Sequence, residues 1–131
     1  MERNGAVVVD THLWIDLFSG KHTPITKALD RLIVLDRANV IGPIFFEVLI
    51  GPKREDHRQY ILGRLRKFTF LPTKSEVWHH TVKLGVLPGV FLRNVPDSDV
   101  LIAAHCEVYD CALFTRDSHF DVFQNLKRFQ I

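Results

Sequence analysis

The sequence predicts a three-layer α/β/α sandwich whose central, mostly parallel sheet has four or five strands. Two observations lead to this fold class. Short β-branched runs without polar alternation, such as residues 6–9, are typical of strands buried on both faces. These runs alternate along the chain with segments of helical periodicity, and helices between strands favour parallel pairing with right-handed crossovers.

Size and composition bound the kind of protein. A chain of 131 residues suits a single domain covering residues 1–131. Its apolar fraction of 47% and charged fraction of 24% are ordinary for a soluble globular protein. The longest apolar runs are far below the roughly 20 residues that cross a bilayer, the polar residues 1–5 do not resemble a signal peptide, and two cysteines are too few for a disulfide scaffold. We therefore expect a cytoplasmic protein without a membrane association.

Each element follows from local signals. The first strand ends at Asp10, and apolar residues at helical spacing then continue to Gly20. Thr23 and Pro24 are typical of a helix start, with Thr as the cap and Pro in the first turn. The remaining expected elements are, in order, the rest of that helix to 37, a strand at 39–42, helices at 43–51 and 56–68, a strand at 69–72, a helix at 75–87, a loop with Pro88, Gly89 and Pro96, a helix at 98–108, a strand at 112–115 and a short fifth strand within 128–131.

Two carboxylates come directly after expected strands. Asp10 ends the first strand, and Asp117 follows the fourth. In open parallel sheets, ligands bind beyond the carboxyl ends of the strands, near the point where the strand order reverses. A charge beside a buried strand is costly unless it is paired or coordinated. Asp is also a good helix cap and a common turn residue, so each position has a structural explanation as well.

Two further carboxylates lie on expected helices. Glu47 has apolar neighbours on both sides in a helix with hardly any other polar residue, which favours an inward-facing side chain. Asp99 adjoins the apolar run 100–104, although an acid in a first helical turn is also favoured by the helix dipole. Asp97 is the more natural cap, or an acid that supports the other four.

Together these four acids predict a metal site. Convergent carboxylates repel one another, and a hard divalent cation that prefers oxygen ligands relieves the repulsion. A magnesium or manganese ion in such a site can promote hydrolysis of a phosphodiester. The hypothesis that follows is hydrolysis of nucleic acid.

The acids and the residues around them resemble the PIN-domain family, and within it the VapC-type toxins of prokaryotic toxin–antitoxin pairs. The resemblance implies a PIN-like sandwich and an endoribonuclease dependent on Mg²⁺ or Mn²⁺. In it, Asp10, Glu47, Asp99 and Asp117 would be the catalytic, metal-binding acids. The matching pieces are Val7-Val-Val-Asp-Thr11, residues 43–51, 99–104 and 113–117, and Phe120.

The same resemblance implies an RNA substrate, an antitoxin partner and a homodimer. Thr115 matches a hydroxyl position that orients a carboxylate or water, and Arg116 either contacts phosphate or points to solvent. Two positions depart from the family pattern. His12 lies where relatives carry a small polar residue, and we expect it to cap the following helix. His119 lies where relatives often have another acid, so the fourth corner of the site rests on Asp117.

Several alternatives remain open. A PIN-like module that binds RNA or protein without catalysis is one, and a metal-dependent phosphatase or DNA nuclease built on the same acids is another. The basic stretch 53–67 either contacts a polyanion or forms a solvated face. A zinc site at His105, Cys106 and Cys111 is disfavoured, because Cys-x₄-Cys here lacks a second ligand pair.

Overall fold

The computed structural model describes residues 5–131, and residues 1–4, most of the polar start of the chain, lie outside that description. In the described residues, a four-stranded sheet has the order β3-β2-β1-β4. All neighbouring strands pair in parallel. The predicted parallel α/β sandwich is therefore confirmed. Its strands are β1 (Val7–Val9), β2 (Ala38–Ile41), β3 (Thr69–Leu71) and β4 (Ala112–Phe114).

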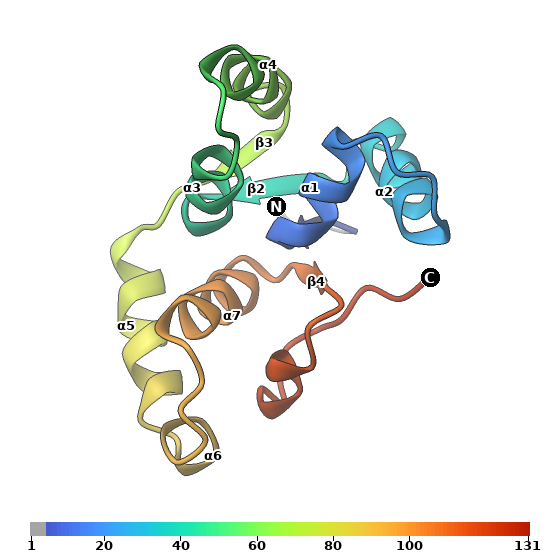
Figure 1. The fold of residues 1–131 in the computed structure, drawn as a ribbon. Coiled ribbons are helices and arrows are strands. Elements are labelled where there is room, and N and C mark those ends of the chain that lie inside the picture. Colours follow the sequence, from blue (N-terminus) through green and yellow to red (C-terminus); the bar gives the residue numbers. More distant parts are fainter. Residues whose placement is uncertain (1–4) are drawn as a thin grey trace.

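The strand order decides which face of the sheet each helix covers. The chain steps from β1 to β2 to β3 in one direction and then returns to β4 at the other end. Right-handed crossovers therefore place α1 to α4 on one face and α5 to α7 on the opposite face. Figure 1 shows α5, α6 and α7 gathered together, apart from α1, α2 and α4. The helices are α1 (Thr11–Phe18), α2 (Pro24–Val34), α3 (Gly42–Ile50), α4 (Glu55–Leu65), α5 (Ser75–Gly85), α6 (Pro88–Phe91) and α7 (Asp97–Tyr109).

The core lies between the sheet and these two helical layers. All three valines of β1 are fully buried, as the run without polar alternation predicts. Leu13 and Trp14 of α1 cover one face of the sheet, and Ile102 of α7 belongs to the opposite layer; all three are at most 1% exposed. No helix among the described residues is long and apolar enough to cross a membrane.

Three local predictions differ from the structure. Residues 88–91, expected as part of a loop, form α6, because Pro88 at the first helical position has a backbone conformation already suited to a helix. The expected fifth strand is reduced to a single parallel bridge between Leu113 and Arg128. Ser118–Val122, for which no element was predicted, forms the 3₁₀ helix η1.

Helix ends also differ by up to three residues. The helix predicted to reach residue 37 ends at Val34, because Asp36 adopts a left-handed conformation (φ 55°) that stops it. Asp110 (φ 56°) ends α7 in the same way, directly before β4.

Packing of α7 against the sheet makes a testable contribution to stability. Truncation of the fully buried Ile102 in Ile102→Ala is expected to lower the free energy of unfolding by about 2–5 kcal/mol, through lost transfer energy and a residual cavity. Val34→Ala, at a side chain 83% exposed on α2, is the control and should change it by less than about 0.5 kcal/mol. Urea unfolding measures both, and equal effects would contradict this packing.

Candidate active site

A cavity of about 310 Å³ opens at the carboxyl ends of β1 and β4. These neighbouring strands flank the point where the strand order reverses, which is where open α/β sheets bind ligands. The structure brings all four predicted acids to this cavity from separate segments of the chain. The lining residues are Asp10, Thr11, His12, Leu13, Glu47, Asp99, Thr115, Arg116 and Asp117.

Asp10 is held on both carboxylate oxygens. It is the N-cap of α1, and its Oδ1 accepts a hydrogen bond from the Thr11 amide at 2.8 Å. Its Oδ2 accepts from the Thr115 hydroxyl at 2.5 Å. The Thr115 oxygen in turn accepts from the amide of Asp117 at 3.0 Å. One threonine hydroxyl therefore connects the end of β1 to the segment after β4, and each Asp10 oxygen still has a lone pair for a cation.

Glu47 reaches the cavity from α3 and is fixed by Thr11. The buried Thr11 hydroxyl donates to Glu47 Oε1 at 3.0 Å, while the Thr11 amide bonds Asp10. Thr11 thus orients two acids at once. No role of Thr11 was predicted from the sequence, although its place directly after Asp10 at the strand end was the available signal.

Asp99, Asp117 and His119 form a compact group. One potential ligand atom from each lies within 4.8 Å of the others. His119 Nδ1 is 3.5 Å from Asp99 Oδ2 and 3.3 Å from Asp117 Oδ1. Asp117 Oδ1 also accepts from the His119 amide at 2.8 Å, which caps η1. The sequence analysis assigned this corner to Asp117 without His119, and the structure places the imidazole in contact with both acids.

Asp99 is the acid of the cavity whose ionised form is disfavoured by its surroundings. Burial raises the pKa of Asp99, and the negative charges of Asp117 and Asp10 raise it further, while His119 opposes the shift. The ionised carboxylates therefore disfavour one another in the absence of a cation. Carboxylate oxygens are the donors that Mg²⁺ and Mn²⁺ prefer. The donor set and the repulsion at Asp99 both fit a divalent cation.

Three other predicted positions have distinct environments. His12 is exposed and lines the cavity, whereas Asp10 caps α1, so the expectation that His12 caps this helix is wrong. Asp97 is the exposed first residue of α7, after the cap residue Pro96, and lies outside the cavity lining. Arg116 lines the cavity and pairs with Asp16, with Nη2 and Oδ2 2.9 Å apart.

His105, Cys106 and Cys111, the residues of the zinc alternative, are buried in the core. His105 is fully buried; its Nδ1 donates to the Leu101 carbonyl at 2.8 Å, and its Nε2 accepts from the Thr73 hydroxyl at 2.8 Å. Burial lowers the pKa of His105 and raises that of the Cys106 thiol, which keeps both groups neutral. These contacts occupy both imidazole nitrogens and argue against a zinc site there.

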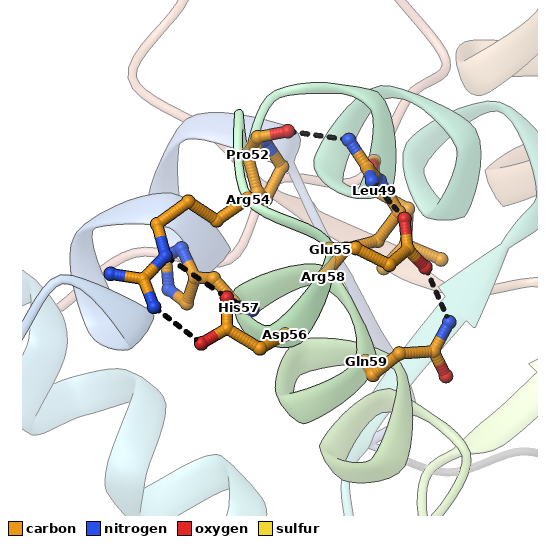
Figure 2. Close-up of polar contacts among 8 residues, drawn as sticks. All are labelled: Leu49, Pro52, Arg54, Glu55, Asp56, His57, Arg58 and Gln59. Carbon is orange, nitrogen blue, oxygen red and sulfur yellow. Dashed lines mark hydrogen bonds and ion pairs between the residues drawn. The ribbon is translucent and has the colours of Figure 1, made fainter.

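Within the basic stretch 53–67, Arg58 joins α3 to α4. Figure 2 shows Arg58 directed back toward the end of α3, where it donates to the Leu49 carbonyl at 2.8 Å and to the Pro52 carbonyl. Arg58 also pairs with Glu55. Arg54 pairs with Asp56 at 2.6 Å (Figure 2). These contacts favour a structural role for the two arginines over a contact with a polyanion.

The repulsion within the site predicts a stability effect. Because the pKa of Asp99 is raised in the folded state, the folded protein loses stability as the pH rises through that pKa. At neutral pH in chelator, Asp99→Asn should therefore raise the Tm by a few degrees. Saturating Mn²⁺ should raise the Tm of the wild-type protein. At a hundredfold excess over Kd, the bound ion adds about 2.7 kcal/mol to the free energy of unfolding. The increase in Tm should be much smaller for the variant. A thermal melt with and without Mn²⁺ tests this, and a variant that melts lower in chelator would contradict it.

Comparison with known proteins agrees with this fold. The PIN domain family model matches residues 7–126. The crystal structure of VapBC2 from Rickettsia felis, bound to a DNA fragment from their promoter, is similar at a TM-score of 0.79 and 15% identity, covering 95% of this chain and 97% of that chain. FitAcB from Neisseria gonorrhoeae is similar at a TM-score of 0.76 and 18% identity, covering 95% of this chain and 96% of that chain. A toxin–antitoxin complex from Klebsiella pneumoniae is similar at a TM-score of 0.69 and 22% identity, covering 86% of this chain and 88% of that chain.

No curated protein matches the sequence. The family match extends from β1 to the segment beyond η1 and so includes every element that contributes to the cavity. The chain belongs to the PIN-domain family.

Proposed function

We propose that this protein is an endoribonuclease that requires Mg²⁺ or Mn²⁺, and that it is the toxin of a toxin–antitoxin pair. The observation that carries the proposal is the convergence of Asp10, Glu47, Asp99 and Asp117 on one cavity at the switch point of the sheet. The acids come from four separate segments, so chance local sequence does not account for their meeting. Membership of the PIN-domain family supports the nuclease assignment.

The side chains divide into ligands and supports. Asp10, Glu47, Asp99 and Asp117 would hold the cation, and it would supply an activated water and offset the charge on the leaving oxygen of the phosphodiester. Thr115 and Thr11 keep Asp10 and Glu47 in place through the hydrogen bonds described above. Such supporting bonds typically change metal affinity or activity by about 10–100-fold.

His119 gives the site an added polar group near Asp99 and Asp117. Its imidazole either contributes a nitrogen ligand or donates a hydrogen bond that fixes one of the two acids. Both roles place a nitrogen where members of the family that this chain resembles often have another acid. His12, exposed at the cavity, is available to contact the RNA strand as it enters.

Similarity to a toxin–antitoxin complex from Klebsiella pneumoniae supports the antitoxin partner. A separate apolar cavity of about 280 Å³ lies between α1, α3 and α4, and its walls include Ile15, Phe18, Val48 and Ile61. An apolar surface of this kind is typical of a site that binds another protein. A homodimer remains part of the proposal, and the exposed side chains of Trp78 and Val82 on α5 and of Val86 at its C-cap offer it an apolar surface.

RNA cleavage tests the proposal. Purified protein should cleave RNA with Mg²⁺ or Mn²⁺ and lose this activity in chelator. Asp10→Asn should lower the rate about 100-fold or more, because a neutral amide is a poorer ligand and leaves the remaining acids without their strand-end partner. Asp30→Asn, an exposed acid on α2, is the matched control and should retain wild-type activity.

Three results would contradict it. Cleavage that resists chelator and survives Asp10→Asn would show that another group or a contaminant cuts the RNA. Stabilisation by Mn²⁺ without cleavage of RNA would favour a PIN-like binding module instead. Cleavage of DNA or of phosphate monoesters in preference to RNA, in the same assay, would favour the other metal-dependent alternatives.

A further inference from the structure

Asp16 is a buried acid that does not belong to the four in the cavity. It lies on α1, five residues after Thr11, and is only 6% exposed. Both of its carboxylate oxygens are paired with cations. Oδ2 is 2.9 Å from Arg116 Nη2, in the segment after β4, and Oδ1 is 3.3 Å from Lys21 Nζ, in the loop after α1. Asp16 therefore joins two parts of the chain that are distant in sequence.

The charge of Asp16 is maintained by these partners. Burial alone raises the pKa of Asp16, but the hydrogen bond and charge of Lys21, together with those of Arg116, outweigh it, so the pKa is lowered. A partly exposed ion pair of this kind contributes little to stability, because solvent screens the attraction between the two charges. The alternative use of such a pair is to fix the orientation of a group. Here that group is the guanidinium of Arg116.

Arg116 lies where a cation is needed. Among the described residues that line the cavity, it is the one with a permanent positive charge, beside Asp10, Glu47, Asp99 and Asp117. Its side chain is 48% exposed, and a guanidinium has five N–H donors, so the contact with Asp16 leaves donors facing solvent. An RNA strand that approaches four carboxylates meets repulsion, which a fixed guanidinium reduces. Arginine also matches the geometry of phosphate with two parallel hydrogen bonds.

We propose that Asp16 is a positioning residue that holds the Arg116 guanidinium at the cavity, where Arg116 binds a backbone phosphate of the RNA. Lys21 pairs with the remaining oxygen of Asp16 and keeps that carboxylate from adding to the negative charge around the site. This inference rests on the proposed function, because it takes RNA as the ligand of the cavity.

The test measures RNA binding in chelator, so that it does not depend on cleavage. The probe is a fluorescently labelled single-stranded RNA of mixed sequence, and its affinity is determined by anisotropy over a series of salt concentrations. Arg116→Gln should weaken binding several-fold and reduce the slope of log K against log salt by about 0.7, the value for one phosphate contact to a single strand. Arg116→Lys should keep the slope and still bind more weakly, because it retains the charge but loses the planar fork.

A double-mutant cycle then tests Asp16 itself. Arg116→Gln should weaken binding several-fold when Asp16 is present and less than about twofold in an Asp16→Asn background, because an unheld guanidinium makes no defined contact. Asp121→Asn breaks the exposed ion pair with Arg128, outside the cavity lining, and is the matched control; in its background the effect of Arg116→Gln should be unchanged. A thermal melt confirms that each variant is folded, and Asp16→Glu replaces Asp16→Asn if the latter is not.

The outcomes separate this inference from the proposed function. An unchanged salt slope in Arg116→Gln overturns the phosphate contact, and an equal effect of Arg116→Gln in both backgrounds overturns the positioning role of Asp16. If the expected binding results are obtained but the wild-type protein does not cleave RNA with Mn²⁺, the inference stands and the nuclease proposal fails.

Discussion

Parallel pairing of β1 with β4 brings together two strand ends that lie more than one hundred residues apart along the chain. Val9 is in register with Phe114, and the Asp10 amide donates to the Phe114 carbonyl at 2.9 Å. The bond from Thr115 to Asp10 depends on this register, since a shift by one residue would turn every side chain of the strand to the opposite face. All three valines of β1 are fully buried, so this pairing lies inside the core.

The position of the other acids follows from the same pairing. Because β1 and β4 flank the reversal of strand order, α1 and α3 approach this edge from one face of the sheet and α7 from the other. Thr11 then links Asp10 to Glu47, and Asp99 meets Asp117 and His119 across the edge. This arrangement brings negative charges close together, and the charges of Asp117 and Asp10 contribute to the raised pKa of Asp99. The fold thus places destabilising charges together, which is expected where a site is built for a ligand rather than for stability.

Local sequence was sufficient for most of the framework. Buried strands, helix starts at Thr23-Pro24 and acids at strand ends all have short-range signals, and the four carboxylates were found from them together with family resemblance. The signals failed where long-range contacts decide the result. Whether residues 128–131 formed a strand depended on how the end of the chain approached β4, and it makes a single bridge.

The same limit explains the supporting residues that were missed. The partners that give Thr11 and Asp16 their roles, Glu47 and Arg116, lie 36 or more residues further along the chain. His119 gains its contacts because η1 begins at Ser118 and brings the imidazole back toward α7. Such pairings follow from the fold and not from neighbouring residues, so one sequence does not reveal them.

A cation bound among the four acids is the feature on which the proposed chemistry depends. Crystals of the protein grown with Mn²⁺, measured for anomalous scattering, would locate the ion directly. We expect an anomalous peak in the cavity within about 2.0–2.4 Å of carboxylate oxygens from Asp10 and at least one of Glu47, Asp99 and Asp117, the range for hard cations and oxygen ligands. If crystals at saturating Mn²⁺ show no anomalous peak in the cavity, or show the ion bound only elsewhere on the protein, the result would contradict this account.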